Sequence, residues 1–475
     1  MKQFAVTCLS LILFASGLIA QIDDPMGGAP QPKKMFHLEV MDNNRYLQME
    51  NGTPFFYLGD TAWELFHRLD KAEAEEYLSD RAEKGFTVIQ AVVLPQLGGI
   101  EAPNAYNELP LIDRDPTQPN EEYFAHIDYI VDMAESLGMY VGMLPTWGSH
   151  WKAYSPSDNP IFNSRNARIY GEFLGDRYRD DPIIWILGGD ANIEIREERR
   201  IIESMAKGIQ KGDGGAHLIT FHPRGPGQSS DFFHTADWLD FNMFQSSHGA
   251  HDHDNGLFAE EDYARTPRKP TLDGEPRYEN IVVGFYFDGA DPKDRFDDFD
   301  VRQAAYWSLL AGACGYTYGN NNIWQMYEPV HQPVIWAEVP WDEALDHPGA
   351  FQMKFVRELF EARPFWKLIP DQSMILDGLI SGGAKIRAAR DQDSSFAFIY
   401  SPYGEPFTVS RDVINSHQVR ETWYNPKYGT SYAVHTGDNT GIQTYTPPTS
   451  GRGNDWILIL DDADKQFPIP GESPR

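Results

Sequence analysis

The stretch IIWILGGD, residues 183–190, is an apolar run that ends in two glycines and an acid. Seven other β-type runs cover residues 55–60, 87–94, 139–145, 217–221, 240–244, 269–272 and 315–318. Apolar residues at helical spacing lie between them, for example over residues 123–137, 167–178, 201–209 and 301–310. Short apolar strands that alternate with helices predict a parallel sheet whose two faces are both covered.

Eight such units within about 265 residues agree with a (β/α)8 TIM barrel, an α/β fold. A doubly wound open sheet is the alternative, but no Gly-rich G-x-G-x-x-G turn follows the first strand. We expect the catalytic barrel to cover residues 35–370. Beyond it, short β-type runs separated by Gly, Pro, Asn and Asp predict a small antiparallel β-sandwich, an accessory domain over residues 371–475.

The N-terminus predicts export. Residues 1–20 combine a short basic start, an apolar stretch and small residues near Ala20, which is typical of a cleaved signal peptide. An uncleaved anchor is the alternative. We therefore expect secretion through the inner membrane, to the periplasm or the cell surface. Cleavage would remove Cys8 and leave Cys314 alone, so we expect no disulfide and a packed core role for Cys314.

Composition excludes several classes of protein. The 475 residues hold 70 Asp and Glu against 40 Lys and Arg, a net charge of −30. A field of this sign repels phosphate backbones and anionic lipid, so we expect no nucleic-acid partner. The N-terminal run is the one long apolar segment, so we expect no integral membrane segment in the mature chain. Neither a G-x-S-x-G elbow nor a phosphate loop is present, and we expect no cofactor.

In a barrel of this kind, catalytic groups lie at the C-terminal ends of the strands. The predicted strand ends carry carboxylates, amides, imidazoles and indoles, which together suit the hydroxyl edges and C–H faces of a sugar. The candidate substrate-binding residues are Asp60, Trp63, Gln90, Trp147, His150, Trp151, Asn192, His222, Gln245, His248, Tyr318 and Trp324. For Trp147, Trp151 and Trp324, core packing is the alternative.

Two acids stand out. Asp190 and Glu275 end strands four and seven, which face each other across a barrel mouth. Glycoside hydrolysis needs such a pair: one acid protonates the leaving oxygen, while the other attacks the anomeric carbon or activates water, depending on their separation. Helix capping is the alternative for each acid. Asp273 competes with Glu275 for its role.

Four stretches resemble glycoside hydrolase family 140: FYLGDTAW (56–63), WILGGDAN (185–192), DGEP (273–276) and AYWSLLAGACGYTYG (305–319). The likeness runs over most of residues 35–465. Members are secreted bacterial clan A barrels with a C-terminal β-sandwich once labelled a collagen-binding domain. The resemblance implies a retaining apiosidase that releases D-apiose-linked side chains from the galacturonan backbone of rhamnogalacturonan II, a plant pectin. It also implies that Asp190 is the acid/base and Glu275 the nucleophile.

One feature departs from most clan A enzymes, which carry Asn-Glu at the end of strand four. This chain has Gly189-Asp190 there, a shorter acid that is a feature of family 140.

The expected partner, a plant pectic polysaccharide or oligosaccharide, is anionic like the chain itself, so binding requires local cations. Lys152, Arg224 and Arg277 fall beside predicted rim motifs and could serve; solvated loop charge is the alternative.

Two other charged runs contain residue types that can bind metals. The run HGAHDHD (248–254) is dense in metal-ligand residue types, but nothing fixes their geometry, so we expect no metal there. The acidic run over residues 288–300 lacks the EF-hand spacing.

Two other functions remain open. One is a clan A glycosidase with a different glycone, because a fold does not fix a substrate. The other is a non-catalytic protein whose sandwich adheres to polysaccharide or matrix.

Overall fold

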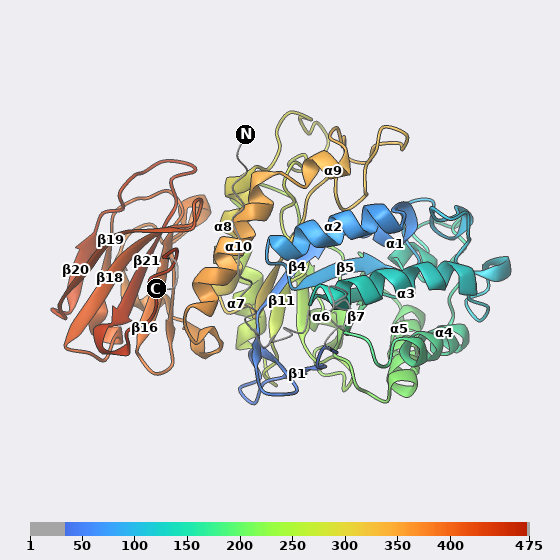
Figure 1. The fold of residues 1–475 in the computed structure, drawn as a ribbon, viewed down its shortest axis with the longest axis horizontal. Coiled ribbons are helices and arrows are strands. Elements are labelled where there is room, and N and C mark those ends of the chain that lie inside the picture. Colours follow the sequence, from blue (N-terminus) through green and yellow to red (C-terminus); the bar gives the residue numbers. More distant parts are fainter. Residues whose placement is uncertain (1–33, 473–475) are drawn as a thin grey trace, which may run out of the picture. The chain divides into compact units, whose positions relative to one another are not determined.

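The computed structural model describes residues 34–472, so the predicted signal peptide (1–20) lies outside the described residues. A nine-stranded sheet has the order β8-β7-β6-β5-β4-β12-β11-β10-β9, with helices on its outer side (Figure 1). Its strands are β4 (Tyr57–Thr61), β5 (Val88–Val92), β6 (Tyr140–Leu144), β7 (Ile183–Gly188), β8 (Ile219–His222), β9 (Gly227–Gln228), β10 (Asn242–Gln245), β11 (Thr271–Asp273) and β12 (Gly315–Tyr318). The strand pairs are parallel except for β9 with β10.

This sheet confirms the predicted (β/α)8 barrel. The first barrel strand, β4, pairs with the last, β12, which nearly closes the sheet. Each of the eight β-type runs overlaps one barrel strand. The sequence interpretation missed an antiparallel meander that precedes the barrel, formed by β1 (Leu38–Val40), β2 (Leu47–Met49) and β3 (Pro54–Phe55).

The helices begin at residues that satisfy their free backbone N–H groups. Asp70, Asn163 and Asp297 each accept hydrogen bonds from the first turn of a helix in a capping box. The helices are α1 (Leu65–Arg68), α2 (Lys71–Glu83), α3 (Glu121–Ser136), α4 (Ser164–Arg177), α5 (Arg196–Asp213), α6 (Ser230–Phe233), α7 (Gly256–Ala264), α8 (Asp298–Leu310), α9 (Trp341–Ala344) and α10 (Pro348–Glu361). Over residues 34–472, none of them is both long and apolar enough to span a bilayer.

The C-terminal part forms the predicted antiparallel sandwich. One sheet has the order β13-β15-β16-β21-β18-β19 and the other β14-β17-β20. The strands are β13 (Leu368–Pro370), β14 (Ile375–Asp377), β15 (Arg387–Asp391), β16 (Phe396–Ser401), β17 (Phe407–Ser410), β18 (Gln418–Asn425), β19 (Thr430–Asp438), β20 (Ile442–Tyr445) and β21 (Trp456–Asp462). Because β13 pairs with β15, the sandwich begins at Leu368 and not at residue 371.

One hydrophobic cluster runs from the barrel helices onto one face of the sandwich, and a second lies inside the sandwich. Tyr306 of α8 stacks on Tyr400 of β16 with ring centroids 5.0 Å apart, and the Phe360 ring of α10 lies 5.4 Å from that of Phe398. A fully buried ion pair joins α8 to the residue before β21, with Arg302 Nη2 2.6 Å from Asp455 Oδ1. The sandwich is therefore packed as part of the fold and not held by a linker.

Cys314 is buried, and burial raises the pKa of its thiol to about 12. The thiol stays protonated at neutral pH, which agrees with the core role expected from the sequence.

We expect Asp455→Ala to lower the free energy of unfolding by about 3 kcal/mol, because it removes the fully buried partner of Arg302 and leaves only the partly exposed Asp298 carboxylate. Lys367→Ala removes an exposed pair with Asp393 and should cost about 0–1 kcal/mol. Urea denaturation of both variants measures the difference. Equal losses would show that the buried pair does not join the two parts.

Candidate active site

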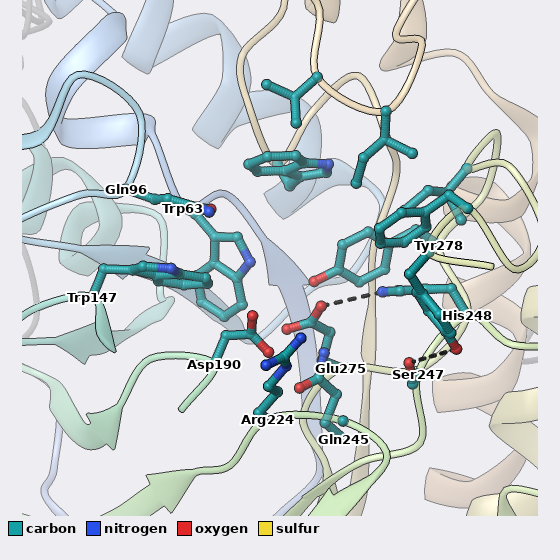
Figure 2. Close-up of a pocket in the computed structure, with 17 residues that line it drawn as sticks. Trp63, Gln96, Trp147, Asp190, Arg224, Gln245, Ser247, His248, Glu275 and Tyr278 are labelled. Carbon is teal, nitrogen blue, oxygen red and sulfur yellow. Dashed lines mark hydrogen bonds and ion pairs between the residues drawn. The ribbon is translucent and has the colours of Figure 1, made fainter. Parts of the chain in front are cut away.

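A pocket of about 390 Å³ opens at the C-terminal ends of the barrel strands (Figure 2). Asp190 and Glu275 both line it, so the structure brings the two predicted catalytic acids together. Five of the predicted substrate-binding residues also line the pocket: Trp63, Trp147, Gln245, His248 and Trp324.

A left-handed turn at the end of β7 places Asp190. Gly188, Gly189 and Asp190 have φ angles of 101°, 82° and 54°, a region that side chains disfavour. A Cβ atom on Gly189 would lie 2.8 Å from the Thr146 carbonyl oxygen and 2.9 Å from the Trp147 Cα atom. Only glycine fits this close approach to the neighbouring strand end, and the turn directs the next side chain into the pocket.

The Asp190 carboxyl is set up to hold a proton. Burial raises its pKa, the negative charge of Glu275 raises it further, and the result is about 7. The charges of His222 and Arg224 act in the opposite direction. Asp190 can therefore serve as a proton donor near neutral pH.

The Glu275 carboxylate is stabilised as an anion. Burial by itself would raise its pKa, but contacts with His222 and His248 outweigh burial and lower it to about 2. His248 Nε2 lies 3.2 Å from Oε1, and His222 Nε2 lies 3.1 Å from Oε2. One imidazole thus faces each carboxylate oxygen.

His222 contacts both acids. The backbone N–H of Asp190 donates to His222 Nδ1 at 3.3 Å, which assigns the ring hydrogen to Nε2. That hydrogen then lies on the nitrogen closest to Glu275. The ring is fully buried and meets Trp63 edge-on, with centroids 5.5 Å apart. His222 is not part of the pocket lining, and the structure indicates a positioning residue between the two acids.

Two other predicted residues support the pocket from behind. Trp151 Nε1 donates to the Gly188 carbonyl at 2.7 Å and so holds the turn before Asp190. The Asn192 side chain accepts from the Arg224 N–H at 2.9 Å and donates to its carbonyl oxygen at 3.3 Å. Neither side chain lines the pocket in this structure, where both bond to nearby backbone, and direct sugar contact by either stays a prediction.

The structure places the remaining four predicted substrate-binding residues away from the pocket lining: Asp60, Gln90, His150 and Tyr318. Asp60 is fully buried and pairs with Arg81, with Tyr77 donating a second hydrogen bond at 2.7 Å. Its carboxylate therefore bonds to the protein inside the barrel, and contact of Asp60 with a sugar stays a prediction.

The polar atoms of the other three residues also form hydrogen bonds within the protein. Gln90 donates to the Gly274 carbonyl at 3.1 Å. The ring of His150 bonds the Pro95 carbonyl at 3.0 Å. The Tyr318 hydroxyl donates to Glu279 at 2.6 Å. All three therefore act as structural supports of the barrel mouth.

Asp273, the competitor of Glu275, points into a polar cluster. Its carboxylate accepts hydrogen bonds from Asn255 at 2.9 Å and from Ser308 and Ser246 at 3.0 Å. Burial raises its pKa to about 6. Because Asp273 does not line the pocket, Glu275 is the acid that faces Asp190.

Sequence reasoning missed most residues on the loops of the pocket: Gln96, Gly225, Ser247, Tyr278, Ile281, Phe285, Tyr286, Val334 and Ile335. The predictions followed strand ends, whereas these residues lie on the longer loops beyond them. Tyr278 had a usable signal, because it lies two residues after the DGEP motif. Its hydroxyl is buried without a hydrogen-bond partner in the described chain, and burial and the Glu275 charge raise its pKa.

Of the three candidate cations, only Arg224 lines the pocket. Lys152 is buried, 2.9 Å from Glu194, and donates to the Asn192 carbonyl. Arg277 is buried and donates to the carbonyl oxygens of the 248–254 run. The Arg224 guanidinium is exposed and makes no ion pair within 4.0 Å among residues 34–472.

The 248–254 run disperses its side chains. His248 meets Glu275, His251 lies 2.9 Å from Asp294 and 3.0 Å from Asp300, and Asp254 pairs with Arg387. Over the part of the chain that the structure describes, no three acidic, His or Cys side chains gather as metal ligands.

Comparison with known proteins agrees with this geometry. Residues 41–367 match the apiosidase-like catalytic domain, and residues 369–461 match the "Putative collagen-binding domain of a collagenase". A solved structure named glycoside hydrolase is 35% identical, covers 91% of this chain and 98% of its own, and has a TM-score of 0.83. A glycoside hydrolase family 5 structure from Bacteroides vulgatus is 32% identical, with 92% and 96% covered and a TM-score of 0.83. No curated protein matches the chain.

A TIM barrel with two opposed acids in its mouth and these relatives define a glycoside hydrolase with a clan A-like fold. The sequence-based prediction of an enzyme of this class is confirmed. The chain belongs to the apiosidase-like family.

We expect Gly189→Ala to destabilise the protein more than Gly52→Ala. The two glycines have nearly equal φ angles, 82° and 81°, but nothing lies within 4 Å of a Cβ atom on Gly52. The left-handed conformation alone should cost about 1–2 kcal/mol at either position. Denaturant unfolding measures both, and equal costs would contradict a role for the close contact at Gly189.

Proposed function

We propose that the chain is a retaining glycoside hydrolase of the family 140 type, which cleaves D-apiose linkages in side chains of rhamnogalacturonan II. The observation that carries this proposal is the opposite ionisation of two acids in one pocket. Asp190 has a pKa raised to about 7, while that of Glu275 is lowered to about 2. A protonated acid beside a permanent carboxylate is the pair that glycoside cleavage requires.

The chemistry follows from these two states. Asp190 gives its proton to the glycosidic oxygen as the bond to the anomeric carbon breaks. A Glu275 oxygen bonds to that carbon and forms a glycosyl ester. The ester carries no negative charge, so the neighbour that raises the Asp190 pKa is lost; the pKa falls, and Asp190, which has given up its proton, stays ionised and available as the general base. It then takes a proton from water, whose oxygen bonds to the anomeric carbon and releases Glu275.

The position of Arg224 supports the proposal of a pectic substrate. The leaving sugar is attached through the oxygen that Asp190 protonates, and Arg224 is the cation whose charge acts on Asp190. Asn192 holds the Arg224 backbone by two hydrogen bonds, which leaves the guanidinium free. A galacturonate leaving group would present a carboxylate to it. The predicted leader would place this activity outside the inner membrane, where plant polysaccharide is met.

We expect Asp190→Asn and Glu275→Gln each to lower the release of apiose from rhamnogalacturonan II fragments by at least about 10³-fold, with unchanged thermal unfolding. Sugar analysis by chromatography measures the product. Azide should restore turnover of an activated aryl apioside by Asp190→Asn, because it replaces the water that the lost base activates. If wild type binds the fragments and releases nothing, the non-catalytic alternative holds; release of another sugar identifies a different glycone.

The pH dependence of kcat/KM should follow the two acids. Asp190 must be protonated, so activity should fall as pH rises through about 7; Glu275 must be ionised, so its protonation limits activity only near pH 2. His248→Gln removes an imidazole that lowers the Glu275 pKa and should move the acid limb upward. Initial rates on an aryl apioside across pH measure both limbs. An unmoved acid limb would contradict the role of His248.

A further inference from the structure

A second cleft of about 320 Å³ adjoins the active-site pocket. Gln96 lines the active-site pocket, and the next residue, Leu97, lines the second cleft. Trp324 also lines the pocket, and the carbonyl of the next residue, Gln325, accepts a hydrogen bond from Arg68 of the cleft. Successive residues thus link the two cavities at two places.

Arg68, at the end of α1, is the cation of this cleft. It is half-buried, and Nη1 donates to the Gln325 carbonyl, which fixes the guanidinium. Among residues 34–472, no carboxylate oxygen lies within 4.0 Å of it. A partly buried cation in this state is stabilised by an anion from outside.

Two acids lie near Arg68, but neither forms an ion pair with its guanidinium. Glu64 lies deeper, where Oε1 accepts from the Leu97 N–H at 3.0 Å and burial raises its pKa to about 7. Glu328 is turned to Trp341, whose Nε1 donates to it at 3.3 Å.

Two unpartnered polar side chains complete the cleft. His67 and Asn104 are 5% and 6% exposed, and His67 Nδ1 and Asn104 Nδ2 have no hydrogen-bond partner in the described chain. Asn104 Oδ1 accepts from the N–H groups of Tyr106 and Glu108, so its amide nitrogen is left as a donor. Burial and the Arg68 charge lower the His67 pKa to about 4, so its neutral ring offers one N–H.

We propose that this cleft is a second carbohydrate subsite, in which Arg68, Asn104 and His67 bind the carboxylate of a uronic acid residue outside the cleaved linkage. A guanidinium fork together with amide and imidazole donors matches the planar, multiple-acceptor shape of a carboxylate. The proposal rests on the proposed function for its substrate, because a galacturonan carries one carboxylate on every backbone sugar. With such a subsite, the acidic enzyme would bind an acidic polymer through a local contact that only a longer substrate can make, although both carry net negative charge.

The kinetic test compares two apiosides, one on a single galacturonate and one on a longer oligogalacturonate. Wild type should have the higher kcat/KM on the longer substrate. Arg68→Gln and Asn104→Asp should each lower the ratio of kcat/KM for the long substrate to that for the short one about tenfold or more. Asn104→Asp keeps the acceptor oxygen that holds the loop and replaces the free donor with a carboxylate oxygen. Arg200→Gln, an exposed arginine on α5, should leave the ratio unchanged.

A binding test separates this subsite from the proposed catalysis. Glu275→Gln protein is titrated calorimetrically with oligogalacturonate and with the same oligomer after reduction of its carboxyl groups. The acidic oligomer should bind, and adding Arg68→Gln or Asn104→Asp should weaken it about tenfold, whereas the reduced oligomer should bind weakly to all. Equal binding of both oligomers, or unchanged binding and rate ratios in both variants, overturns the subsite. If apiosides are not cleaved but Arg68→Gln still weakens oligogalacturonate binding, the proposed function fails and the subsite stands.

Discussion

At the end of β7, three successive residues take the left-handed backbone conformation, and at the first two, Gly188 and Gly189, the neighbouring strand ends leave no space for a Cβ atom. The Thr146 carbonyl follows β6, and the His222 carbonyl that crowds Gly188 ends β8. This crowding sets the direction of Asp190 and also turns its N–H toward His222. A backbone constraint thus fixes both the position of one acid and the tautomer of the imidazole that reaches the other.

The difference between the two acids arises from their hydrogen-bond donors and not from their depth. Both side chains lose solvent, which by itself raises the pKa of either. Glu275 gains two imidazoles and becomes the stable anion, and that anion then keeps the proton on Asp190. The Glu275 carboxylate thus adds to burial in keeping Asp190 protonated, and the pair titrates as a unit.

The sequence predicts the barrel strands and the two acids of this site, but it misses many of the other residues that line the pocket. Hydrophobic runs locate all eight barrel strands, and strand ends followed by glycine locate Asp190 and Glu275. The same rule also selects Asp60, whose partner Arg81 lies on α2 between β4 and β5, and only packing shows that this pair is internal. The strand-end rule does not find Tyr278 or Ile335, because these residues lie on loops that show no regular apolar spacing.

The stacking of Tyr306 on Tyr400 and of Phe360 against Phe398 has a consequence for how this enzyme can be reused. Cutting the chain after the barrel would bare an aromatic surface to water on each fragment. The sandwich can therefore not be removed or exchanged as an independent domain. A minimal catalyst made from this chain must keep both parts, or the interface between them must be redesigned.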